Sequence, residues 1–177
     1  MNNDSYKVFR RIGFSDERGE LSEIYKDSEF KNVVGSNFSF VQENLVISRQ
    51  NSLRGLHYQS SPKMQGKFVS VIMGEIFDVI VDIRSNSRSF SSSYCFTLSS
   101  DNQKSLWIPP GFAHGFLTIS EKSIVSYKLT EYYSLEHSRS IKWNSPKLDI
   151  PWPNKINIIL SDKDKNAKEF DETEIYA

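Results

Sequence analysis

The sequence predicts an all-β protein, built as an antiparallel β-sandwich or jelly roll with a few short helices. The 177 residues include 12 Phe, 8 Tyr and 3 Trp, residue types that are enriched in strands. Short apolar and β-branched runs follow one another, and the turns between them leave little room for the crossover helices that a parallel sheet needs. At about 150 residues per domain, the length predicts a single domain that spans residues 1–177.

In chain order, the first expected element is a short helix at residues 28–34, which Gly35 ends. A strand is expected next at residues 45–48. The clearest strand signal follows, in two β-branched runs at residues 68–73 and 76–83. We predict that these two runs pair as a β-hairpin, because a short link that contains glycine joins them.

Alternation within the second run places its side chains on two faces. The odd-numbered residues from Phe77 to Ile83 share one face, and Asp78 and Asp82 lie on the other. A frayed helical piece is expected near the end of the chain, at residues 166–170. The remaining strands are expected at residues 94–98, 105–108, 115–119 and 123–129.

Charge and composition exclude several classes of protein. The 22 Lys and Arg balance the 22 Asp and Glu, so no overall field attracts nucleic acid or an anionic membrane. No stretch approaches the ~18 apolar residues of a membrane-spanning helix, and the N-terminal residues lack the apolar segment of a signal peptide. The one cysteine, Cys95, leaves no internal disulfide and suits a reducing compartment. We therefore expect a cytoplasmic protein without nucleic-acid or membrane partners.

A metal centre is not expected. A zinc site needs three or four His, Cys or carboxylate ligands, and the sequence has neither a His-x-His nor a Cys-x-x-Cys pair. The segment from Pro110 to His114 looks like the second half of a cupin metal motif, but Tyr58 and Gln59 stand where the first half would need a second histidine. A metal-dependent cupin oxygenase is therefore kept only as an alternative.

One cluster of cationic residues suits proton transfer on an anionic substrate. The cluster consists of Arg54, His57 and Lys67, which lie close to one another in the sequence. Imidazole titrates near neutral pH and acts as a general base, while an ammonium group stabilises a developing negative oxygen. The alternative is a strand with a hydrogen-bonded histidine and two solvated cations. In a regular strand Arg54 and His57 point to opposite faces, so a shared site needs an irregular backbone, which Gly55 permits.

Two further residues are candidates for the same chemistry. Tyr127 shares a strand face with Val125 and Leu129, so its hydroxyl is expected to point inward, where a purely structural role is the alternative. Asp162 and Asp164 offer carboxylates that would orient a histidine, although a charged surface turn explains them equally.

Taken in order, these segments resemble the dTDP-4-dehydrorhamnose 3,5-epimerase family from about residue 14 to residue 164. No single motif is specific, but their combination is. The resemblance implies a cupin-type antiparallel β jelly roll that forms a homodimer. It also implies a reaction on a nucleotide-diphosphate-linked 4-keto-6-deoxyhexose, with no cofactor and no required metal. The motifs are FSDERG (14–19), FVQEN (40–44), LRGLHYQ (53–59), QGK (65–67), FDV (77–79), VDIR (81–84), LWIPPGFAHGF (106–116), YK (127–128), WP (152–153) and LSDKD (160–164).

The resemblance implies roles for four residues in the inversion of C3 and C5. The ketone at C4 acidifies both carbons, so a base can remove a proton to form an enolate. His57 is expected to be the base, with Asp164 bound to its other ring nitrogen. Lys67 is expected to stabilise the enolate, and Tyr127 to be the acid on the opposite face.

The resemblance also implies a substrate pocket. Arg54 and Arg18 are expected to bind the diphosphate through forked hydrogen bonds. The N-terminal strand region, residues 8–25, is expected to cross to the partner subunit of the homodimer. The other expected pocket residues are Leu21, Glu23, Gln42, Asn44, His114, Tyr133, Ser138 and Lys163.

Three positions depart from the family pattern. Leu21 replaces an aromatic residue that would stack on the base, residues 45–48 replace a polar run, and Ser138 replaces an acidic residue. These positions would set nucleotide or sugar recognition, so the nucleotide and the sugar stay open. The alternatives are a 3-epimerase or a 3,4-ketoisomerase acting on another nucleotide sugar, and a binding cupin without catalysis.

Overall fold

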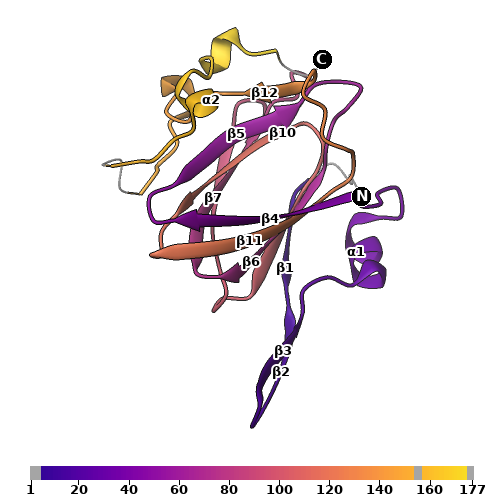
Figure 1. The fold of residues 1–177 in the computed structure, drawn as a ribbon. Coiled ribbons are helices and arrows are strands. Elements are labelled where there is room, and N and C mark those ends of the chain that lie inside the picture. Colours follow the sequence, from indigo (N-terminus) through magenta and orange to yellow (C-terminus); the bar gives the residue numbers. More distant parts are fainter. Residues whose placement is uncertain (1–4, 154–156, 175–177) are drawn as a thin grey trace.

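Two antiparallel sheets form a sandwich in the structure, a computed structural model that describes residues 5–153 and 157–174 (Figure 1). Its fold is the predicted cupin-type jelly roll. The first sheet has the strand order β1 (Lys7–Arg10), β9 (Lys104–Ile108), β6 (Lys67–Met73), β11 (Lys122–Leu129) and β4 (Gln42–Arg49). The second sheet has the strand order β12 (Ser138–Ser140), β5 (Leu53–Gln59), β10 (Phe112–Thr118), β7 (Glu75–Asp82) and β8 (Ser93–Ser99).

A separate two-stranded hairpin lies outside the sandwich. It consists of β2 (Ile12–Asp16) and β3 (Gly19–Glu23), and it projects away from the two large sheets in Figure 1. The short helices are α1 (Asp27–Val34), η1 (Pro146–Leu148), α2 (Asp162–Lys165) and η2 (Phe170–Glu172).

The predicted hairpin at residues 68–83 is wrong. Its two strands form as expected, but β6 pairs with β9 and β11, whereas β7 pairs with β8 and β10 in the other sheet. Gly74 makes the corner between the sheets with φ +81°, and a Cβ there would lie 2.2 Å from the carbonyl oxygen of Lys122. The chain therefore passes from one sheet to the other at Gly74. Both β6 and β7 then bury apolar side chains in the core between the two sheets.

Both faces of β7 are buried, which explains its almost continuous apolar sequence. Val79 and Val81 pack on the outer face of the second sheet, against C-terminal residues that include Trp152. Ile76 and Ile80 face the interior between the two sheets. The alternation predicted for this run is thus confirmed: its two faces lie in different cores, one between the sheets and one beneath the C-terminal segment.

The helix predictions have different outcomes. The first helix is confirmed, and the backbone N–H of Gly35 donates to the carbonyl of Lys31 at its end. The helical piece expected at residues 166–170 is misplaced, because α2 begins earlier, where the side chain of Ser161 accepts a hydrogen bond from the backbone N–H of Asp164. Among the described residues, no helix is long and apolar enough to span a membrane.

Candidate active site

An irregularity in β5 brings Arg54 and His57 to the same side of the strand. Opposite β10, residues 55 and 56 of β5 occupy the space of one residue, Gly115. Gly55 has φ +122°, and a Cβ there would lie 2.5 Å from the Cα of Gly115. This bulge supplies the irregular backbone that a shared site requires, and both side chains line one cavity.

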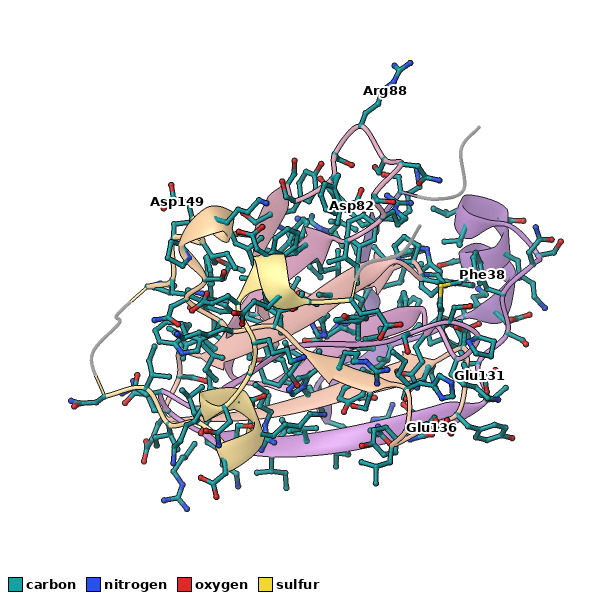
Figure 2. All side chains as sticks on the ribbon, turned by 90° about the horizontal axis from the view of Figure 1, so that it is seen from above. Phe38, Asp82, Arg88, Glu131, Glu136 and Asp149 are labelled. Atoms are coloured by element: carbon teal, nitrogen blue, oxygen red, sulfur yellow. The ribbon has the colours of Figure 1, made fainter. Side chains whose placement is uncertain are left out.

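This cavity, with a volume of about 480 Å³, lies between the two sheets beside the C-terminal segment. A larger cavity of about 880 Å³ lies beside the loop whose Arg88 points away from the sandwich in Figure 2, but none of the predicted site residues lines it. The smaller cavity is lined by Val46, Ser52, Leu53, Arg54, His57, Phe116, Tyr127, Ile159, Leu160, Ser161 and Asp164.

His57 and Asp164 form a close pair at this cavity. Nε2 of His57 lies 2.5 Å from Oδ1 of Asp164, and the other carboxylate oxygen accepts a hydrogen bond of 2.9 Å from Ser161. The Asp164 side chain is buried, whereas the His57 side chain is 34% exposed. Ser161 therefore holds the carboxylate in place, and the side of the imidazole away from Asp164 remains open to the cavity.

The surroundings favour a neutral imidazole beside an ionised carboxylate. Burial lowers the pKa of His57, and Lys67 and Lys163 add to this effect, while Asp164 opposes it. Burial raises the pKa of Asp164, but hydrogen bonds from His57 and Ser161 outweigh it, and the resulting pKa lies below its ordinary value. A neutral histidine can accept a proton at neutral pH, which is the state a general base needs.

Lys67 brings a buried positive charge close to His57. Its ammonium group donates a hydrogen bond of 3.1 Å to the backbone carbonyl of His57, and the residue is 8% exposed. Burial lowers the pKa of Lys67 to about 8, with Asp78 raising it and Lys163 lowering it further. The amine is thus mostly protonated at neutral pH and loses its charge in mildly alkaline solution.

Like Lys67, His114 is not among the side chains that line the cavity. Its Nε2 is 2.8 Å from Oδ2 of Asp78, and both side chains are buried. Oδ1 of Asp78 is also buried and has no hydrogen-bond partner among the described residues. The pair therefore places a second carboxylate in the interior near Lys67, and substrate contact by His114 stays a prediction.

Tyr127 reaches the cavity from the opposite sheet. It lies on β11 between Asn44 of β4 and Val69 of β6, and its ring packs against the core between the sheets. Within the described part of the chain, no residue forms a hydrogen bond with its hydroxyl group. The hydroxyl thus lacks the interior partner that a purely structural tyrosine would need.

Polar contacts orient Arg54 at this cavity, and Ser138 and Lys163 at a separate cavity of about 630 Å³. Nε of Arg54 donates to Oγ of Ser48 at 3.0 Å. The ammonium group of Lys163, on α2, donates to Oγ of Ser138 at 2.8 Å. Ser138 therefore binds a cation of its own chain.

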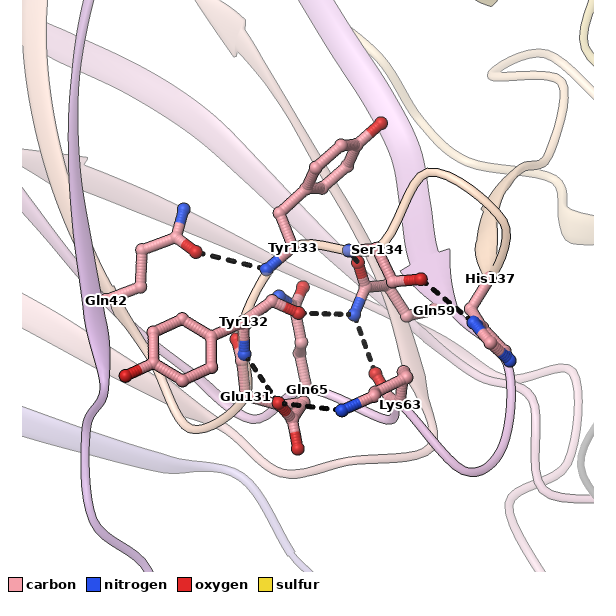
Figure 3. Close-up of polar contacts among 9 residues, drawn as sticks. All are labelled: Gln42, Gln59, Lys63, Gln65, Glu131, Tyr132, Tyr133, Ser134 and His137. Carbon is pink, nitrogen blue, oxygen red and sulfur yellow. Dashed lines mark hydrogen bonds and ion pairs between the residues drawn. The ribbon is translucent and has the colours of Figure 1, made fainter.

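Gln42, Asn44 and Tyr133 form a second cluster. Nε2 of Gln42 donates to Oδ1 of Asn44 at 3.0 Å, and its Oε1 accepts from the backbone N–H of Tyr133 at 3.0 Å. Figure 3 shows this contact beside those of the residues that follow β11. The side chains of Gln42 and Asn44 lie on the same face of β4.

The structure does not bring Arg18, Leu21 or Glu23 to this cavity. All three lie on the projecting hairpin, where Arg18 bonds to Asp16 of the same turn and Leu21 is 64% exposed. Strand β1 precedes the hairpin and pairs with β9 of the same chain, and the exchange of residues 8–25 with a partner subunit stays a prediction.

Sequence reasoning missed three side chains that support the site. Ser161 and Ser48 hold Asp164 and Arg54, and Asp78 influences Lys67. The Ser-x-x-Asp spacing at residues 161–164 is a helix N-cap signal that would have identified Ser161. Ser48 and Asp78 contact residues on other strands, and no local spacing reveals such pairs. Across residues 5–153 and 157–174, no group of three or more His, Cys, Asp or Glu side chains is placed to hold a metal ion.

Comparison with known proteins identifies the family. A family model described as dTDP-4-dehydrorhamnose 3,5-epimerase matches residues 4–172. The dTDP-4-dehydrorhamnose 3,5-epimerase of Shigella flexneri is 43% identical over 92% of this chain and 90% of that protein. The Escherichia coli enzyme of the same name is 45% identical over 90% of this chain and 86% of its own length.

A solved structure gives the same result for the fold. The dTDP-6-deoxy-D-glucose-3,5-epimerase of Legionella pneumophila, in complex with dTDP-4-keto-L-rhamnose, superposes with a TM-score of 0.92. It is 41% identical, and the match covers 96% of this chain and 89% of that chain. On the strength of these matches over nearly its whole length, the chain belongs to the dTDP-4-dehydrorhamnose 3,5-epimerase family and is an isomerase.

Proposed function

We propose that this protein inverts C3 and C5 of a nucleotide-diphosphate-linked 4-keto-6-deoxyhexose, as in the conversion of dTDP-4-dehydro-6-deoxyglucose to dTDP-4-dehydrorhamnose. One observation carries the proposal: a cavity lined by His57 of the second sheet with its partner Asp164 of α2, and by Tyr127 of the first sheet. A base and an acid on opposite sides of a sugar ring are what inversion through an enolate needs.

The proposed reaction begins at His57. Because Asp164 accepts the proton of Nε2, Nδ1 carries the lone pair and takes the proton from C3 of the sugar. The C–H electron pair forms the C3–C4 double bond of the enolate, and the negative charge on the C4 oxygen is stabilised by the ammonium group of Lys67.

Inversion is completed from the other face. The hydroxyl of Tyr127 delivers a proton to C3, the carbonyl at C4 re-forms, and the configuration at C3 is reversed. His57 then loses its proton and the Tyr127 oxygen regains one, through solvent, before the same steps take place at C5. Every proton is supplied by a side chain or by water, so the scheme requires neither a cofactor nor a metal, and activity is expected to survive chelation.

Deuterium incorporation tests the proposal directly. In D2O with dTDP-4-dehydro-6-deoxyglucose, the product should carry deuterium at both C3 and C5 with inverted configuration at each. Label and inversion at C3 alone would favour the 3-epimerase alternative. Absence of label at either carbon, with this and with other nucleotide-linked 4-keto-6-deoxy sugars, would contradict the proposal.

The rate of epimerisation should depend on pH through two groups. Above about pH 8 it should fall, because Lys67, whose pKa burial lowers to about 8, loses the charge that stabilises the enolate. In acid it should fall as His57 becomes protonated, and burial places that loss below the ordinary histidine pKa of 6.5. Initial rates measured between pH 5 and pH 10 check both limbs.

Asp78→Asn provides a sharper test of the alkaline limb. Asp78 raises the pKa of Lys67, so removing its charge should move this limb to lower pH. Asp101→Asn removes an exposed carboxylate and should leave the profile unchanged. An alkaline limb that does not move in a folded Asp78→Asn protein would show that Lys67 does not cause it.

The homodimer is part of the proposal, with the β2–β3 hairpin as the exchanged element. Phe14 and Leu21 are paired across this hairpin, with exposures of 60% and 64%. Exposed apolar side chains on a projecting hairpin suit burial against a second copy. In the partner's cavity the same hairpin would present Arg18 and Glu23, which lie far from the cavity of their own chain.

A charged hairpin should separate the subunits. Phe14→Glu combined with Leu21→Glu is expected to convert the dimer to a monomer in light scattering and to reduce kcat/KM by about tenfold or more. Val33→Glu, on the exposed face of α1, provides the control and should leave both unchanged. A monomeric double variant with wild-type kcat/KM would contradict the exchange of the hairpin.

A further inference from the structure

The loop that follows β11 is held by side chains instead of by a sheet. We call residues 131–134 the tyrosine loop, because it carries Tyr132 and Tyr133 in its centre. Nε2 of Gln65 donates to the carbonyl of Glu131 at 2.8 Å, and Oε1 of Gln42 accepts from the N–H of Tyr133 at 3.0 Å. Gln42 of β4 and Gln65, which precedes β6, thus each hold a backbone group of this loop (Figure 3).

A third glutamine, Gln59, makes the central contacts. Its Nε2 donates to the carbonyls of Lys63 at 2.7 Å and Tyr132 at 3.2 Å, and its Oε1 accepts from the N–H of Ser134 at 2.7 Å. The residue is 3% exposed. Both donor positions of the amide and its acceptor are used, so the site matches glutamine in particular among side chains of this size.

The position of Gln59 connects the tyrosine loop to the base. It lies two residues after His57 on β5, so the two side chains point to the same face of the strand. Gln42 reaches the loop from β4 of the other sheet. The loop is therefore tied to both sheets that enclose the cavity, immediately after the strand that carries Tyr127.

We propose that Gln59 is a positioning residue that holds the tyrosine loop, and with it Tyr133, in place before the substrate binds. The inference rests on the proposed function and on the contact between Tyr133 and the substrate that the family resemblance predicts. Ordering a binding loop in advance reduces the entropy lost on binding. The contacts that orient His57, Asp164 and Lys67 do not involve the loop, so the expected effect is on binding and not on proton transfer.

Gln59→Met keeps the length of the side chain and removes all three hydrogen bonds. The Ser134 amide should then exchange with solvent about tenfold faster, as measured by hydrogen exchange on peptides that cover residues 130–137. KM for dTDP-4-dehydro-6-deoxyglucose should rise about five- to tenfold while kcat stays within about twofold, because uniform binding is lost. Unchanged exchange in peptides from β7 shows that the fold is intact.

Two other glutamines complete the experiment. Gln50 donates to the carbonyl of Ile119 at 2.9 Å, so Gln50→Met removes the same kind of bond elsewhere and should change neither readout. Gln65→Met, at a half-buried position, removes only the bond to Glu131 and should change both readouts in the same direction by a smaller factor. If Gln59→Met fails to fold, the two measurements on Gln65→Met replace it in the test.

Several outcomes would overturn the inference. Wild-type exchange at Ser134 would show that Gln59 does not hold the loop, and faster exchange with wild-type KM would show that the loop does not serve binding. Tyr133→Ala must also raise KM, without further increase when combined with Gln59→Met. If the wild-type protein does not turn over the sugar, the proposed function fails separately, and calorimetric affinity for the same nucleotide sugar replaces KM.

Discussion

His57→Ala is expected to lower kcat by about 10²–10⁴-fold or more while the protein folds normally. Without the imidazole no other group at the cavity accepts the C3 proton, because Asp164 lies behind the ring and is buried. Folding should tolerate the change, since the His57 side chain is partly exposed to the cavity. Deuterium exchange at C3, together with the melting temperature, measures both effects.

Graded variants separate the roles within the pair. Asp164→Asn should cost less than His57→Ala, because it leaves the imidazole in place and removes the carboxylate that fixes its tautomer. His137→Ala changes a histidine outside the cavity, bonded to Ser134, and should leave kcat within about twofold. Wild-type exchange in His57→Ala would refute the base, and a silent Asp164→Asn would refute its partner.

Tyr127→Phe is expected to separate proton removal from inversion. The substitution keeps the ring that packs between the sheets and removes only the hydroxyl, so stability should change little. His57 can still form the enolate and return a proton from the same face. Deuterium from D2O should therefore still enter the substrate at the carbon that His57 reaches, while inversion falls by about 10²-fold or more.

A structural tyrosine predicts a different result. Loss of a buried hydrogen bond would cost about 1–3 kcal/mol of stability, and exchange and inversion would decline together. The hydroxyl has no hydrogen-bond partner among the described residues, which favours the first result. Equal loss of exchange and inversion in a destabilised protein would remove Tyr127 from the mechanism.

Local patterns were sufficient for most strands and for the first helix. Alternation in β7 predicted which side chains share a face, because that period is a property of a single strand. Gly35 predicted the end of α1 through its own backbone freedom. The motif between residues 53 and 59 predicted the glycine that the irregular strand requires, and the structure places His57 of the same motif at the cavity.

Strand pairing was not predictable in the same way. The short link at Gly74 is compatible with a hairpin and with a corner between sheets, and only the burial of both flanking strands in one core selects the corner. Ser48 beside Arg54 and Asp78 beside His114 are likewise pairs between strands. The packing of the two sheets sets the first contact, and the pairing of β7 with β10 sets the second, and neither is a local property of one strand.

By itself, the sequence determined the fold class, the family motifs and the residue types from which proton transfer can be built, since each depends on local pattern or on motif order. The tertiary structure alone decided which of these residues meet. It set His57 and Asp164 2.5 Å apart although they are far apart in sequence, placed Tyr127 across the same cavity, and closed the tyrosine loop onto Gln59. The physical reason is that these contacts arise when two sheets pack around a common core. Burial there lowers the pKa of Lys67. It also removes polar groups from water, so that they need hydrogen-bond partners from distant parts of the chain.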